Sequence, residues 1–253
     1  MTDTTWPDEP YRRKTVFVLN QTDIDALRFE EDGPELLLNE ETHILPYPPQ
    51  QSNPIVQDLI DSGIARPGTV LIQSPFDKDI YQNSTQAVEL FALDKHFYFS
   101  RLCRYLGARE VTIKQIKCKN IEEETTVSLE GSVPMRGSVD GKIKNKELAS
   151  LREKLVLKDK LPGGAPDVPA ARELLRKTGL LGDANMRSLF DMRQGSNNQL
   201  ASRELQLNVT TETRSNLNVL ANLTVPPYLS LEAGYDRHVH EQTEFTLTIK
   251  VDF

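Results

Sequence analysis

Cysteine, histidine and long apolar runs are all scarce in this sequence, and each scarcity excludes a class of protein. The two cysteines, Cys103 and Cys118, are too few for a disulfide framework in a chain of 253 residues and lack metal-ligand spacing. No apolar run approaches the ~18 residues that a membrane-spanning helix needs. Residues 1–10 contain no apolar segment of the kind that a secretory signal requires. We therefore expect a cytoplasmic protein.

Positive charge is scarce at the N-terminal end of the chain. Residues 1–50 hold eleven acidic and four basic side chains, a surplus that equals the whole net charge of −7. An acidic surface disfavours the phosphate backbone of nucleic acids. The most basic stretch, residues 142–160, contains no aromatic side chain that could stack on a base. We therefore do not expect a nucleic-acid partner.

The sequence has no familiar catalytic or cofactor motif. It lacks a phosphate-binding Gly-Lys-Ser/Thr loop, a nucleophile elbow and a His-Glu-x-x-His zinc motif. His96 is a candidate general base near Asp94 or Cys103 in an aromatic segment, although no partner is placed beside it. We therefore expect no cofactor and regard an enzyme with an unrecognised site near residues 84–118 as an alternative only.

The best metal candidates are His238 and His240, which would share one face of a strand because they are two residues apart. Zinc needs a third and usually a fourth ligand. Arg214 and Asn216 would lie opposite this pair, and a guanidinium beside a dication is unfavourable. The sequence therefore favours a protein without a metal site.

Local patterns predict alternating helices and strands over most of the chain. Apolar, β-branched runs predict strands at 15–20 and 69–73, whereas four prolines in 43–54 predict an extended loop. Three- and four-residue spacing of apolar side chains predicts a core helix over 84–106, ended by Gly107. Helix caps are predicted at three further positions, which are Asn53, Asp167 and Asp183.

The C-terminal end alternates apolar and polar residues over two long segments. The period of two runs from 205 to 225 and from 229 to 253, and only Leu220 breaks it in the first segment. Antiparallel pairing in which the two residue numbers sum to 454 brings apolar side chains together at the base of such a hairpin. The base pairs are Leu205 with Ile249, Leu207 with Leu247 and Val209 with Phe245.

The tip of this expected hairpin is apolar again, beyond a polar middle portion. We predict that its apolar side chains meet a partner, because exposed apolar patches commonly mark interaction sites. The predicted interaction residues are Leu217, Val219, Leu223, Val225, Leu229, Leu231 and Tyr235.

The sequence thus predicts an α+β fold: a long twisted antiparallel sheet with a C-terminal β-hairpin (205–225/229–253), flanked by several helices. We expect one domain over 1–253, with an acidic N-terminal subregion (1–66) and a β-rich body (67–253). The favoured function is non-enzymatic binding or assembly, in which the amphipathic hairpin engages a protein partner or a second copy of the chain.

A second functional interpretation is a pore-forming effector stored in soluble form, which would meet a membrane only after activation. Long amphipathic hairpins are what a β-barrel pore needs. This architecture is similar to that of gasdermin and perforin-like pore formers, but no motif of this chain carries a resemblance to either family. Arg237 and Glu241 argue against a pore, because both would fall on the lipid-facing side.

Overall fold

The computed structural model describes residues 5–29, 33–49, 53–119, 124–129, 144–195, 200–229, 231 and 243–253. The chain forms two compact units. Unit 1 comprises Met1–Val88 and Glu212–Gln242, and unit 2 comprises Glu89–Thr211 and Thr243–Phe253. Both units mix helices and strands, so the predicted α+β class is confirmed. Their bounds differ from the expected 1–66/67–253 division, and the behaviour of the chain as one domain stays a prediction.

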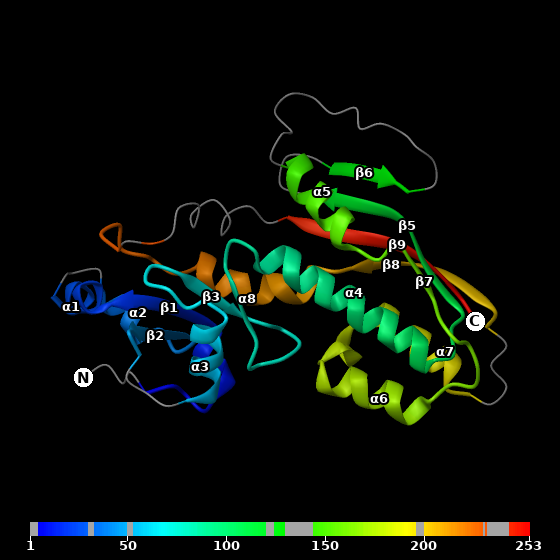
Figure 1. Ribbon diagram of the computed structural model, residues 1–253, viewed down its shortest axis with the longest axis horizontal. Helices are drawn as coiled ribbons and strands as arrows, with labels where there is room; N and C mark the ends of the chain where they lie inside the picture. Colours follow the sequence, from blue (N-terminus) through cyan, green and yellow to red (C-terminus); the bar gives the residue numbers. More distant parts are fainter. Residues whose placement is uncertain are drawn as a thin grey trace. The chain divides into compact units, whose positions relative to one another are not determined.

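Unit 1 is built on a mixed sheet of four strands in the order β2-β1-β3-β4. Strand β1 pairs in parallel with β2 and antiparallel with β3, and Figure 1 shows it between them. The strands are β1 (Thr15–Asn20), β2 (Thr42–Tyr47), β3 (Val70–Gln73) and β4 (Tyr81–Asn83). The helical elements are η1 (Pro10–Arg13), α1 (Gln21–Phe29), α2 (Gly33–Leu38), α3 (Pro54–Asp61) and α8 (Thr211–Ala221).

Strand β2 occupies part of the segment for which a loop was predicted, so that prediction is wrong for residues 43–47. Its Pro46 lies opposite Leu19 of β1. Strand β2 stands at the end of the strand order, where a missing N–H removes little pairing. Proline therefore does not prevent the strand here, and the buried Ile44 and Leu45 hold it against the core.

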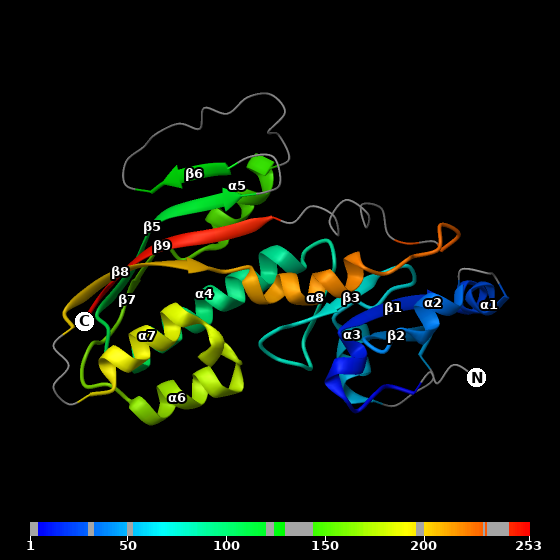
Figure 2. The same cartoon turned by 180° about the vertical axis from the view of Figure 1, so that it is seen from behind.

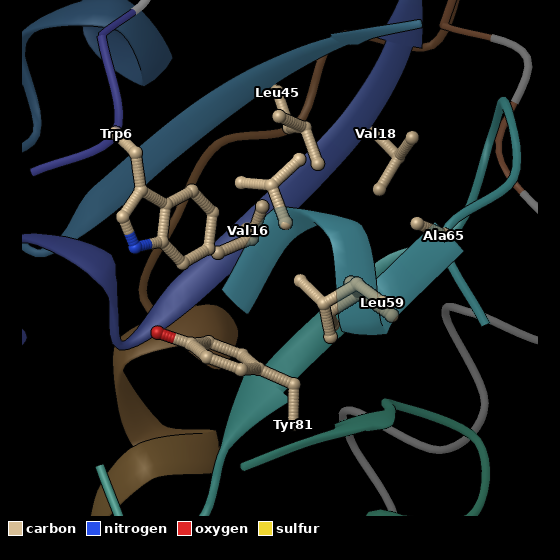
Figure 3. Close-up of a cluster of buried hydrophobic side chains, with 9 residues drawn as sticks. Trp6, Val16, Val18, Leu45, Leu59, Ala65 and Tyr81 are labelled. Carbon is tan, nitrogen blue, oxygen red and sulfur yellow. The ribbon is translucent and has the colours of Figure 1, made fainter. Parts of the chain in front are cut away.

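The core of unit 1 forms where β1 meets α3. Residues 15–19 of β1 are buried on both faces, as expected for a central strand in a parallel pair. Figure 3 shows the indole of Trp6 and the ring of Tyr81 lying over this aliphatic cluster. The buried members of the cluster are Trp6, Val16, Val18, Leu45, Val56, Leu59, Ala65, Leu71 and Tyr81.

Three predicted helix caps are confirmed. The side chain of Asn53 accepts hydrogen bonds from the backbone N–H groups of Ile55 and Val56, and Pro54 is the first residue of α3. The carboxylates of Asp167 and Asp183 cap helices α6 (Val168–Lys177) and α7 (Ala184–Arg193) in the same manner. These short motifs were predictable because the cap and the residues it satisfies are adjacent in the sequence.

Unit 2 is built on an antiparallel sheet in the order β6-β5-β9-β8, with β7 also paired to β5. Its strands are β5 (Glu110–Lys119), β6 (Glu124–Ser128), β7 (Lys158–Lys160), β8 (Ser202–Asn208) and β9 (Glu244–Asp252). The helical elements are α4 (Ala87–Tyr105), α5 (Lys144–Lys154), α6 (Val168–Lys177), η3 (Leu180–Gly182) and α7 (Ala184–Arg193). Helix α4 ends at Tyr105, and Gly107 just after it has a φ of 81°, the left-handed conformation predicted for it.

Helices cover the apolar face of this sheet. Every second side chain of β9 is buried, beginning with Phe245 and ending with Val251. Figure 1 and Figure 2 both show α4 beside α7, and the guanidinium of Arg193 in α7 donates to the carbonyl of Leu106 just after α4. The same guanidinium lies 4.2 Å from the centre of the Phe253 ring. The C-terminus is thus held against the helical layer.

The predicted C-terminal hairpin is right at its base and wrong over 211–221. Strands β8 and β9 pair in the predicted register, with Leu205 opposite Ile249 and Leu207 opposite Leu247. Beyond Asn208 the chain turns into α8, so no long hairpin is formed by these residues. The correction has a clear cause: Leu220, which breaks the alternation, is fully buried by the helix. Residues 232–242 of the predicted second arm lie outside the described residues.

Burial of the β8 inner face predicts the stability of unit 2. Leu207 is fully buried, so Leu207→Ala should lower the free energy of unfolding by about 2–5 kcal/mol through lost burial and the cavity left behind. The neighbouring Gln206 has an exposed side chain, so Gln206→Ala should change it by less than about 0.5 kcal/mol. Urea unfolding followed by circular dichroism measures both, and equal midpoints would contradict the assigned register.

Candidate functional site on helix α4

The structure does not bring the predicted interaction residues together on a strand. Leu217 and Val219 lie on α8 and are half-buried, and Leu229 is buried in the turn that follows. Leu223, Val225 and Leu231 are half-buried outside regular structure, and Tyr235 lies outside the described residues. A role of these side chains in binding a partner stays a prediction.

No described group of three or more His, Cys, Asp or Glu side chains could hold a metal ion. The predicted metal candidates, His238 and His240, lie outside the described residues. Helix α4 carries reactive side chains on its buried side and aromatic side chains on its exposed side.

His96 lies on the buried side of α4. Its imidazole is almost fully buried, and burial lowers its pKa from 6.5 to about 4, partly opposed by the charge of Asp159. Its Nε2 atom has no hydrogen-bond partner among the described residues. The ring is therefore neutral at pH 7 and a weak base.

Burial also changes the pKa values of Cys103 and Asp94, the expected neighbours of His96. The Cys103 thiol is completely buried, which raises its pKa well above the ordinary value, so it stays protonated. Desolvation also raises the pKa of Asp94. A thiolate–imidazolium pair would need the opposite shifts for cysteine and histidine. These residues therefore do not form an activated nucleophile in this structure.

Ser100 adds a hydroxyl to the same helix, one turn after His96. Its Oγ donates to a carboxylate oxygen of Asp159 on β7. A catalytic serine instead gives its proton to an imidazole that a carboxylate orients. Here the Ser100 hydroxyl bonds directly to the Asp159 carboxylate and not to the His96 imidazole. The hydrogen bonds therefore do not follow the serine–histidine–aspartate order of a catalytic triad. The contact joins α4 to β7.

A buried ion pair joins α4 to α7. The ammonium of Lys95, which is fully buried, lies 2.8 Å from Oδ2 of Asp183. The other carboxylate oxygen of Asp183 accepts from the backbone N–H groups of Asn185 and Met186, the second and third residues of α7. One carboxylate thus neutralises a buried cation and caps a helix, which fixes the position of α7 relative to α4.

Removal of the charge on Asp183 should destabilise the fold, because the buried ammonium of Lys95 loses this ion pair. Asp183→Asn keeps an oxygen for the cap but removes the carboxylate charge from the ion pair with Lys95, so the free energy of unfolding should fall by about 3–5 kcal/mol. Glu173→Gln, which removes an exposed ion pair on α6, is the matched control and should change little. Urea unfolding of the three proteins measures the effect, and similar midpoints for both variants would refute it.

The buried imidazole predicts a loss of stability in acid. In the unfolded chain His96 takes up a proton near pH 6.5, whereas in the folded chain it does so only near pH 4. As pH falls through this window, the unfolded state binds more protons than the folded state. The contribution of His96 to stability is therefore present above pH 6.5 and lost toward pH 4. The variant His96→Gln should lose less stability over the window than the wild type. Parallel plots of midpoint against pH would show that His96 does not titrate as described.

The opposite side of α4 presents aromatic and arginine side chains to solvent. Phe97 is 62% exposed and packs edge-to-face on Tyr98, with ring centres 6.2 Å apart. One turn further, the guanidinium of Arg101 lies 5.7 Å from the ring centre of Tyr105 and its Nε donates to the phenol oxygen. Arg104 is exposed beside them. We call Phe97, Tyr98, Arg101, Arg104 and Tyr105 the α4 face.

The α4 face was not predicted from the sequence, because the helix over 84–106 was expected to lie in the core with all its aromatic side chains. Phe91 and Phe99 are indeed completely buried, but Phe97 is not. The signal was present in the spacing: Phe97, Arg101 and Tyr105 are four residues apart and therefore share one side of a helix. Two of these three are polar or amphipathic, which indicates a side turned to water.

Comparison with known proteins assigns no family to this chain. No family model matches it, and neither a curated protein nor a solved structure matches it significantly. Within the described residues, no helix combines the length and the apolar character needed to cross a membrane.

Proposed function

We propose that this protein is a non-enzymatic binding or assembly protein that engages a protein partner through the α4 face. The observation that carries the proposal is the exposed Phe97 ring beside the Arg101–Tyr105 pair. Aromatic side chains and arginine are enriched at the centres of protein interfaces, where they supply most of the binding energy. A large apolar ring left in water on a well-packed helix fits that role.

The buried side of α4 supports this role by holding the face rigid. Phe91, Phe99, Leu102 and Cys103 are completely buried on it, and Lys95 is tied to Asp183. Such packing fixes the backbone from which the exposed rings project. Binding then costs little backbone entropy, and the Arg101–Tyr105 contact holds those side chains in position before a partner arrives.

The charge of the α4 face favours an acidic partner surface with apolar side chains. Arg101 and Arg104 project from it, and unit 2 as a whole has 22 Lys and Arg against 18 Asp and Glu. Unit 1 has the opposite balance, with 8 basic and 19 acidic residues. A second copy of the chain, presenting its acidic unit 1, therefore has suitable chemistry, as does a different acidic protein.

Site-specific cross-linking tests the proposal. A photo-reactive amino acid at position 97 of the full chain should capture a protein in cells that express it, whereas one at Arg187, which is exposed on α7, should not. A captured copy of the chain itself would identify assembly. The binding constant is then measured with the purified partner, or by sedimentation for self-association.

Substitutions on the face should weaken that complex. Phe97→Ala and Arg101→Glu should each lower affinity at least about tenfold, because both remove central contacts. Added salt should weaken the complex of the wild type more than that of Arg101→Glu. The matched control is Arg187→Glu, which changes charge equally elsewhere on unit 2. Equal affinities for Arg101→Glu and Arg187→Glu would show that general charge, and not the α4 face, binds the partner.

A further inference from the structure

Helix α8 is composed of residues that favour helices poorly. Of its eleven residues, six are threonine, serine, asparagine or valine. These types lose side-chain freedom in a helix or compete for its backbone hydrogen bonds. Tertiary contacts must therefore supply the stability of α8.

Those contacts fit the helix only in part. The fully buried positions of α8 are Thr213 and Leu220, with Asn216 nearly so, whereas Leu217 and Val219 remain half-buried. The buried hydroxyl Oγ1 of Thr213 has no hydrogen-bond partner among the described residues. Burial of an unsatisfied hydroxyl is unfavourable. The helix thus buries polar groups while apolar ones stay partly in water.

The same residues fit a strand that continues β8. In β8 the odd-numbered Leu205 and Leu207 are buried, and the even-numbered side chains point away from the core. Val209 keeps the pattern, since its N–H donates to the carbonyl of Phe245 in the register of the β8–β9 pair. Past this point the odd positions are first polar, at Thr211, Thr213 and Ser215, and then apolar at 217, 219, 221, 223 and 225. Pro226 and Pro227 would end the strand.

We infer that α8 is a convertible segment, which is held as a helix in this structure and can extend as a continuation of β8. Two contacts favour the helix: the side-chain amide of Asn216 donates to the carbonyl of Gln73 at 2.7 Å, and Leu220 is buried. Three properties favour the strand: low helix propensity, the unsatisfied Thr213 hydroxyl and the alternation of apolar residues. A segment can convert between two conformations when some of its properties favour the helix and others favour the strand.

The two forms differ greatly in length, so a distance distinguishes them. Spin labels on cysteines placed at Thr211 and Asn222 of the full chain would be about 16 Å apart along a helix. Along a strand the same eleven steps span about 36 Å. A disordered segment of this length would give a broad distribution near 19 Å by a random-coil estimate. Pulsed electron resonance on the frozen protein measures this distribution.

Paired substitutions at exposed positions of α8 should shift the populations. Ser215 and Asn218 are both exposed, so changing them removes no buried contact. Ser215→Ala with Asn218→Ala favours the helix and should leave one narrow peak near 16 Å. Ser215→Val with Asn218→Thr favours the strand and should add a peak near 36 Å.

A label pair at Ala184 and Gln194 is the control for an intact fold. This pair spans α7, which no substitution touches, and should stay at about 15 Å in every variant. A single peak near 16 Å in both variant pairs would overturn the inference. So would a broad distribution near 19 Å in the strand-favouring variant, because it would indicate local unfolding. The result is independent of the α4 face, so either proposal can fail alone.

Discussion

The pairing of β9 between β5 and β8 is the contact on which unit 2 depends. Nearly the whole length of β9 is bonded on both sides, and its buried face supplies the apolar surface that the helices cover. Without that surface, α4 would have no side to bury and its charged and aromatic side chains could not be sorted into inner and outer sets. The α4 face is therefore a consequence of sheet formation by residues 140 positions away in the chain.

Burial explains the protonation states of the reactive residue types that α4 carries. His96, Ser100 and Cys103 share the inner side of the helix, where low polarity favours the uncharged forms of histidine and cysteine. Lys95, a charged group on the same side, forms an ion pair with Asp183. The polar contacts of Ser100 and Lys95 join α4 to β7 and α7. The α4 face lies on the other side of the helix.

Local signals in the sequence were sufficient for several elements of the fold. Caps such as Asn53 and Asp183 involve neighbours in the chain, and the β8–β9 register follows from two short apolar patterns that allow one alignment. Strand β2 was missed because its proline outweighed the apolar residues around it. The α4 face was missed because the aromatic composition of the helix suggested a core position, and the four-residue spacing of Phe97, Arg101 and Tyr105 was not considered. Which side of α4 is buried depends on strands far away in the sequence.

The error at α8 shows how the two periods can coincide. In residues 217–221 the apolar side chains are Leu217, Val219, Leu220 and Ala221, which match a strand except at Leu220 and match a helix through the 213–217–220 spacing. The alternation over 205–225 outweighed one exception in the sequence interpretation, yet that exception, Leu220, is the apolar side chain that α8 buries completely. A single residue that fits only one period therefore carries more information than several that fit both.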